Sequence, residues 1–335
     1  MVIDNNFYMR LALREAWKYQ GLTYPNPAVG CAIVSDYGEI LAVEAHHKAG
    51  LAHAEVNALK QAYFKLTQDT SILTLEASLD IHTYLLANHH NIFENCSIYT
   101  TLEPCSHVGR TPSCATLISK LGIKKVYVGM LDKNEKAHNG NKLLEQSGSE
   151  VHINVLKEEC AALVYPFKKF LDDKFVFFKW AQRLNGTTDD GIISSELSRK
   201  SVHAMRDVCD LLVIGGNTVR TDRPTLDARL VNGKAPDILI LSRSKEFDTT
   251  IPLFNVKDRK VYIEDNLEKL AVYKNIMIEG SSQMYALTRD IVDYYLCYLA
   301  PSIGGVNGLD TQEDKFEILN VSKESQDIIM WMKRI

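Results

Sequence analysis

The sequence predicts an α/β protein made of two domains. Its 335 residues exceed the size at which a single hydrophobic core usually stops growing. Strand-like and helix-like segments alternate through both halves, and this alternation favours layered α/β folds. The polar segment Asp172–Lys174 interrupts the pattern. We therefore expect one domain over residues 1–172 and a second over residues 173–335.

The composition is that of an ordinary globular protein, with 46% hydrophobic and 24% charged residues. A formal net charge of −4 argues against a broad basic surface for nucleic acid or for a membrane. No stretch approaches the ~18 apolar residues of a membrane span, and the first residues carry acids instead of the apolar run of a secretory signal. The seven cysteines are an odd number, so we expect reduced thiols and a cytoplasmic protein.

The elements of the first half follow from hydrophobic periodicity and turn signals. Apolar residues recur at helical spacing from Phe7 to Tyr19, and two short apolar runs flank a turn at Tyr37-Gly38. A helix is expected to begin near His53. The complete expected order is a helix at 7–19, strands at 30–34 and 40–43, a helix from 53, a strand at 97–101, a helix at 112–121, a strand at 125–130 and a helix around 142–146.

Residues 66–95 lie between the helix that begins near His53 and the next strand, and they contain no recognisable motif. We interpret them as a helical insertion. Three histidines, His82, His89 and His90, fall within it. A metal-binding histidine tract is the alternative interpretation, although exposed histidines in such a segment are usually inert.

The second half begins with the apolar run FVFFKWA at Phe175. Further short apolar runs are separated by helical or loop segments, which again favours an α/β layer. The strands expected after the first are at residues 211–215, 238–241, 260–263, 276–279 and 294–300.

The sharpest motif combines His53-Ala54-Glu55 with Pro104-Cys105 and a second cysteine, Cys114. One imidazole and two thiolates make a three-ligand set, which leaves one position of a tetrahedral zinc ion open for water. The sequence therefore predicts a catalytic Zn²⁺ held by His53, Cys105 and Cys114. A closed structural zinc site is the alternative; it needs a fourth ligand, and His107 is the candidate.

Glu55 follows His53 by two residues and is not expected to be a ligand. Near the start of a helix, its carboxylate can reach water at the metal, take its proton and pass protons to departing ammonia. The pattern of His-x-Glu with Pro-Cys resembles that of the zinc deaminases. A structural zinc site has no use for such an acid, so the pattern favours a catalytic site.

Longer segments resemble one family, the bifunctional deaminase/reductase of riboflavin biosynthesis. These segments are YPNPAVGCAIV from Tyr24, HHKAGLAHAEVNAL from His46 and TLEPCSHVGRTPSC from Thr101. The resemblance continues through the second half and omits only the insertion. It implies a cytidine-deaminase-like three-layer α/β/α domain followed by a dihydrofolate-reductase-like α/β domain.

In the first domain, the resemblance implies substrate contacts from Asn26, His46, His107 and Arg110. An amide can read a base edge through paired donor and acceptor bonds. Arginine and histidine side chains suit a ribose phosphate. Each residue alone is weak support, because Asn before Pro is usually turn chemistry.

In the second domain, the resemblance implies a substrate site and an NADPH site. The segments that carry it are FVFFKWAQRLNG, SRKSVHAMRD, GGNTVRTDRPTLDAR and IEGSS. The substrate residues are Lys179, Arg206, Leu226, Arg229 and Glu279. The cofactor residues are Ala181, Thr218, Asp222, Ser242, Ser281 and Ser282.

Two positions depart from the family pattern. The family commonly has two adjacent acids where this chain has Asp222-Arg223, and a glycine-proline pair where it has Ser281-Ser282. Glycine lets a cofactor phosphate approach the backbone closely, although serine N–H and hydroxyl groups can also donate. A deaminase with a degenerate reductase domain is therefore kept as an alternative.

The function implied is zinc-dependent deamination of 2,5-diamino-6-ribosylamino-4(3H)-pyrimidinone 5′-phosphate, followed by NADPH-dependent reduction of its ribosyl group. The expected partner is this small nucleotide, with no nucleic acid and no membrane, and a homo-oligomer is expected through the reductase domain. A deaminase acting on another nucleotide or on a nucleic-acid base is the remaining alternative; a nucleic-acid deaminase would need a basic groove with stacking aromatics.

Overall fold

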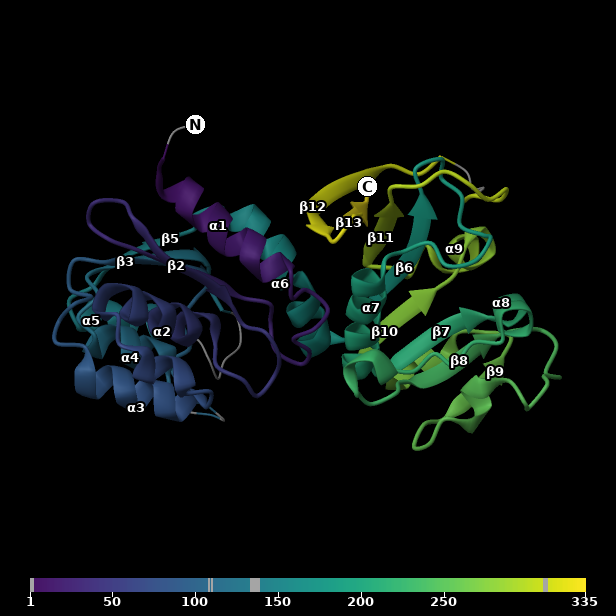
Figure 1. Cartoon of the computed structure of the whole chain (residues 1–335), viewed down its shortest axis with the longest axis horizontal. Coiled ribbons are helices and arrows are strands. Elements are labelled where there is room, and N and C mark those ends of the chain that lie inside the picture. The colour runs from purple at the N-terminus through teal and green to yellow at the C-terminus, as the bar shows by residue number, and fades with distance from the viewer. Residues whose placement is uncertain (1–2, 108, 110, 133–138, 310–312) are drawn as a thin grey trace. The chain divides into compact units, whose positions relative to one another are not determined.

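The computed structural model describes residues 3–107, 109, 111–132, 139–309 and 313–335 (Figure 1). The chain divides into two compact units, Met1–Phe167 and Lys168–Ile335. The division falls inside helix α6 (Lys157–Asp172), which the sequence analysis did not predict. Within the described residues, no helix is long and apolar enough to cross a membrane.

The first unit is built on a five-stranded sheet in the order β2-β1-β3-β4-β5. Strand β1 pairs antiparallel with both β2 and β3, whereas β3, β4 and β5 run parallel. The strands are β1 (Gly30–Val34), β2 (Ile40–Ala45), β3 (Ser97–Leu102), β4 (Lys125–Met130) and β5 (Glu150–Ile153). All predicted strands of this half are present, and β5 is an addition.

Helices cover both faces of this sheet, which confirms the expected three-layer arrangement (Figure 1). Helix α1 (Asn5–Trp17) packs so closely on one face that a Cβ at Gly30 of β1 would lie 1.9 Å from the Ala12 carbonyl oxygen. Helices α2 (Ala54–Thr67) and α4 (Cys114–Lys120) lie on the opposite side from α1. Helix α5 (Gly140–Gln146) packs beside α4.

The insertion is helical as predicted, and several of its residues are buried. It forms a short 3-10 turn (Thr70–Thr74) and helix α3 (Ser78–Asn88). Ile72, Leu85 and Phe93 are fully buried and belong to the same core as α2 and α4. The insertion therefore completes the hydrophobic core on the side of the two helices that carry the metal-site motif.

The second unit contains an eight-stranded sheet in the order β12-β13-β11-β6-β10-β7-β8-β9. The six strands from β11 to β9 are parallel, and an antiparallel hairpin of β12 and β13 extends the sheet beside β11. The strands are β6 (Phe175–Arg183), β7 (Leu211–Gly215), β8 (Asp237–Leu241), β9 (Val261–Glu264), β10 (Asn275–Glu279), β11 (Tyr294–Ala300), β12 (Phe316–Glu324) and β13 (Asp327–Arg334).

Three helices follow strands of this sheet, as expected for parallel strands that need crossover connections. They are α7 (Glu196–Val208), α8 (Gly216–Asp222) and α9 (Ser282–Thr288). Central strands β6, β7 and β10 are buried almost throughout, which explains their continuous apolar runs in the sequence. The predicted strands are all present, and the hairpin of β12 and β13 is an addition.

Candidate active sites

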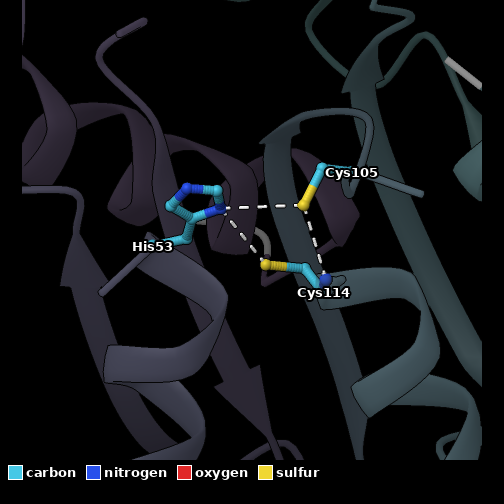
Figure 2. A group of neighbouring side chains, drawn as sticks. All are labelled: His53, Cys105 and Cys114. Carbon is cyan, nitrogen blue, oxygen red and sulfur yellow. Dashed lines mark hydrogen bonds between the residues drawn. The ribbon is translucent and has the colours of Figure 1, made fainter. Parts of the chain in front are cut away.

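The three predicted zinc ligands converge in the first unit (Figure 2). His53 is the residue before α2, Cys105 lies in the turn after β3, and Cys114 begins α4. Their ligand atoms all lie within 4.8 Å of one another. The Sγ atoms of Cys105 and Cys114 lie 3.7 Å and 3.4 Å from Nδ1 of His53, so Nδ1 is the nitrogen that faces the thiols.

This donor set fits a zinc ion. Two sulfur atoms and one imidazole nitrogen are ligands that zinc prefers, and three protein ligands leave one position for reaction. His107 is not part of the cluster, which removes support for a closed four-ligand site. The other ring nitrogen of His53, Nε2, lies 3.2 Å from the Thr111 hydroxyl, which fixes the orientation of the imidazole.

The two thiols are electrostatically unequal. A hydrogen bond from the Cys114 thiol and the proximity of His53 together outweigh burial and lower the pKa of Cys105 to about 4. The same hydrogen bond raises the pKa of Cys114. Burial lowers the pKa of His53, but the hydrogen bond with Cys105 and the charges of Glu55 and Cys105 outweigh burial and raise this pKa overall. Cys105 is thus a thiolate ready to bind a metal.

Glu55 lies in the first turn of α2 and is only 4% exposed. Burial raises the pKa of this carboxyl group to about 7, and the charge of His53 opposes the shift. A buried carboxyl group with a pKa near neutrality, beside the metal ligands, has the properties of a general acid and base.

A cavity of about 320 Å³ opens beside the cluster. Asn26, His46 and His107 line it together with His53 and Glu55. The fourth expected contact, Arg110, lies outside the described residues. Leu51 and Phe167 contribute apolar wall to the same cavity.

His46 contacts Asn26 within the cavity wall. His46 is 2% exposed, and burial lowers its pKa to about 4. Its Nδ1–H donates to the Ala52 carbonyl oxygen at 3.0 Å, which leaves Nε2 to accept from the Asn26 amide at 3.1 Å. A neutral His46 therefore orients the Asn26 side chain.

Sequence reasoning missed Glu103 and Asp132, which also line the cavity. Glu103 lies inside the TLEPC segment, so its proximity to Cys105 could have been noticed. Asp132 follows β4, the parallel neighbour of β3. Parallel strands end at the same edge of a sheet, and this rule could have placed Asp132 beside the metal ligands.

In the second unit, strand register brings Lys179 and Glu279 together. Strands β6 and β10 are parallel neighbours with Lys179 directly paired to Glu279. Burial lowers the pKa of Lys179, although the charge of Glu279 opposes this. The Nζ atom of Lys179 also lies 5.7 Å from the centre of the Tyr298 ring. The ammonium group of Lys179 is therefore shielded from solvent and lies beside Glu279.

Arg206 forms a salt bridge with Glu279 instead of presenting a free cation. Its Nε and Nη2 atoms lie 3.1 Å and 2.9 Å from Oε1 of Glu279. Burial raises the pKa of Glu279, but the charges of Arg206 and Lys179 outweigh it and lower the pKa overall. The side chains of Arg206 and Arg229 are 11% and 59% exposed, so Arg229 is the more accessible cation for a phosphate.

Arg229 is nevertheless partnered, because its Nη1 lies 2.6 Å from Oδ1 of Asp227. Leu226, the remaining substrate residue expected, is 6% exposed and adopts a positive φ of 54°. Its carbonyl oxygen accepts a hydrogen bond from Arg259 at 2.7 Å. Arg259 therefore anchors the loop that carries both Leu226 and Arg229.

A second cavity, of about 410 Å³, opens where β7 and β8 end. Its lining includes backbone at Gly215-Gly216 and the side chains of Arg220, Ser242 and Arg243. A Cβ at Gly216 would lie 2.6 Å from the Ser242 hydroxyl, so only glycine keeps this wall open. Glycine backbone with hydroxyl and guanidinium donors is a lining that fits a phosphate-bearing cofactor such as NADPH.

Of the six predicted cofactor residues, Ser242 lines this cavity. Ala181, Thr218, Asp222, Ser281 and Ser282 are not among its lining residues. Ser282, at the start of α9, donates its hydroxyl to the Gly308 carbonyl oxygen at 3.0 Å. Asp222, which ends α8, is partly buried, and this burial raises the pKa of its carboxyl group.

Comparison with known proteins assigns a family to each half of the chain. Residues 3–130 match the cytidine and deoxycytidylate deaminase zinc-binding region. Residues 174–329 match the RibD C-terminal domain. The fold and the two sites thus define a zinc-dependent deaminase joined to an NADPH-dependent reductase.

Relatives of similar length extend this assignment. The riboflavin biosynthesis protein RibD of Actinobacillus pleuropneumoniae is 32% identical over 89% of this chain and 84% of that protein. RibD of Aquifex aeolicus is 30% identical over 99% of both chains. The chain belongs to the RibD family of bifunctional riboflavin biosynthesis enzymes.

Solved structures agree with this membership. A diaminohydroxyphosphoribosylaminopyrimidine deaminase/5-amino-6-(5-phosphoribosylamino)uracil reductase from Thermotoga maritima is 27% identical, with a TM-score of 0.63 over 99% of both chains. RibD of Acinetobacter baumannii is 25% identical, with the same TM-score and coverage. The expected combination of a deaminase-like and a reductase-like domain is confirmed.

Proposed function

We propose that the first unit deaminates 2,5-diamino-6-ribosylamino-4(3H)-pyrimidinone 5′-phosphate and that the second unit reduces the ribosyl group of the product. The observation that carries the first step is the cluster of His53, Cys105 and Cys114 beside the buried acid Glu55. A three-ligand zinc site with an adjacent proton shuttle is what hydrolytic deamination requires.

In the deamination step, His53, Cys105 and Cys114 would hold the zinc ion. Zinc held there would supply an activated water as the nucleophile for the ring carbon that bears the amino group. Glu55 would accept a proton from the attacking water and deliver a proton to the amino nitrogen, which would leave as ammonia. Asn26, held by His46, offers an amide to the edge of the pyrimidine ring.

In the reduction step, the ribosyl ring opens and C1′ gains a hydride, which NADPH supplies when bound. The cavity lined by Gly216, Arg220 and Ser242 would hold this cofactor. Lys179 and Glu279 are neighbours on β6 and β10, and they would bind the ribose hydroxyls and supply the proton that accompanies the hydride. Arg229 is the exposed cation suited to the 5′-phosphate.

We also propose that the protein assembles through its reductase domain. Strand β12 forms an edge of the eight-stranded sheet and exposes Ile318 and Val321, at 58% and 55%. An exposed apolar edge strand favours pairing with another chain. Val321→Lys is expected to shift the sedimentation coefficient toward that of the monomer, and an unchanged coefficient would contradict assembly through β12.

The cytoplasm is the compartment we propose. All seven cysteines lie in the described part of the chain and are free thiols. Two of them are proposed metal ligands, which must be reduced to bind zinc.

The metal assignment is tested by zinc content and ammonia release. Cys105→Ser and Cys114→Ser are each expected to lose tight zinc binding and deamination, because the hydroxyl group is a poor replacement for a thiolate ligand. Cys96→Ser is the matched control, since Cys96 is buried but lies outside the cluster. A Cys105 or Cys114 variant with full zinc and full activity would overturn the assignment.

A further inference from the structure

Glu103 has no part in the chemistry described above, yet it connects the metal-ligand turn to the cavity wall. It lies in the turn between β3 and Cys105 and is 7% exposed. Its Oε2 accepts a hydrogen bond from the backbone N–H of Asp132 at 3.1 Å, and its Oε1 accepts one from the N–H of Asn141 at 3.0 Å. One buried carboxylate therefore joins Cys105's turn to two positions of the segment that follows β4.

Backbone packing brings the same parts together independently. Strands β3 and β4 are parallel, with Leu102 paired to Met130, so the residues after each strand meet at one edge. Gly140, which begins α5, packs directly on the metal-ligand turn: a Cβ there would lie 1.8 Å from the Pro104 carbonyl oxygen. No side chain fits between these two pieces of backbone.

Asp132 connects this junction to the deamination site, because Asp132 and Glu103 both line the deamination cavity. An ionised carboxylate accepts hydrogen bonds through both oxygens, whereas the amide of glutamine offers one acceptor and one donor group. The two backbone N–H groups that face Glu103 require two acceptors. A carboxylate at position 103 can therefore accept both hydrogen bonds, one with each oxygen, whereas glutamine would place its NH₂ group against one of the two N–H donors.

We propose that Glu103 is a positioning residue for deamination: its carboxylate fixes Asp132 in the cavity wall relative to the metal ligands and so sets the affinity for the substrate. This inference rests on the proposed deaminase function. It assigns Glu103 to substrate binding and not to holding zinc or moving protons.

The test is the kinetics of Glu103→Gln in the full-length zinc enzyme. We expect KM for the diaminopyrimidinone nucleotide to rise about tenfold, because a buried N–H left without an acceptor is costly. We expect kcat to change by no more than about twofold, with zinc content unchanged. Glu145→Gln is the matched control, since Glu145 lies exposed on α5 in the same domain, and it should leave KM unchanged.

Two further variants separate positioning from general destabilisation. Gly140→Ala forces the same junction apart from the other side and should also raise KM. In a double-mutant cycle, Glu103→Gln added to Asp132→Ala should raise KM no further than Asp132→Ala alone, because both act through one group. Effects that multiply would overturn the proposal.

The remaining outcomes are also decisive. An unchanged KM in Glu103→Gln contradicts the proposal, as does loss of zinc or a fall in kcat alone. Calorimetric titration of the deaminated product nucleotide should show a dissociation constant about tenfold weaker in the variant. If wild-type protein releases no ammonia, the proposed function fails, while the titration still tests the role of Glu103.

Discussion

At the residue scale, Glu55 and the three metal ligands have separable tasks. Glu55→Gln keeps the size of the side chain but removes its ability to carry a proton. We expect ammonia release to fall about 10²–10⁴-fold, the usual contribution of a general acid and base. Zinc content should stay at the wild-type value by elemental analysis. An active variant would mean that another group moves the protons.

Lys179 tests the second domain at the same scale. Its neighbours across the sheet include Glu279, and burial lowers its pKa, so it is unlike an ordinary surface lysine. Lys179→Met should abolish NADPH oxidation on the deaminated product while ammonia release stays unchanged. Lys174→Met, outside the strand, is the control. Normal NADPH oxidation by Lys179→Met would show that Lys179 has only a structural role in its strand.

The residues of the metal site could be predicted from the sequence. The hydrogen bonds and ion pairs between side chains within each site could not. His53, Cys105 and Cys114 form a motif whose chemistry is readable from residue type and spacing. The pairing of Arg206 with Glu279 joins a helix to a strand 73 positions away, and no local pattern reports such a contact. For the same reason, the hydrogen bond between His46 and Asn26 was not predicted.

At the element scale, the insertion supports the core beneath the metal-site helices. Leu85 of α3 is fully buried against this core, whereas Leu79 of the same helix is 62% exposed. Leu85→Ala should lower the free energy of unfolding of the first domain by about 2–5 kcal/mol. Leu79→Ala should change it by no more than about 0.5 kcal/mol. Chemical denaturation measures both, and equal effects would contradict a core role for α3.

Periodicity located most elements because apolar spacing reflects which face is buried. It missed α6, β5 and the hairpin of β12 and β13. Helix α6 contains Pro166, and an internal proline usually indicates a helix boundary. Strand β12 has no fully buried residue, so its sequence lacks the apolar run that identifies β6 or β7. The core role of the insertion was likewise invisible, because its apolar residues pack against segments distant in the sequence.

For the whole molecule, two compact units with separate sites predict two separable activities. A zinc chelator should abolish ammonia release, because the metal ligands belong to the first unit alone. The same chelated protein should still oxidise NADPH when given the deaminated nucleotide. Readdition of Zn²⁺ should restore ammonia release. Loss of both activities on chelation would show that the second unit depends on the metal.

The central claim is that one chain performs both reactions in order. The most direct measurement follows ammonia and NADPH together, using purified protein and the diaminopyrimidinone nucleotide. Without NADPH, the account predicts ammonia equal to the nucleotide consumed. Once NADPH is added, its oxidation should approach one equivalent per ammonia released. Ammonia without any NADPH oxidation would contradict the account and would show that Ser281-Ser282 and Arg223 belong to a reductase domain that has lost its reaction.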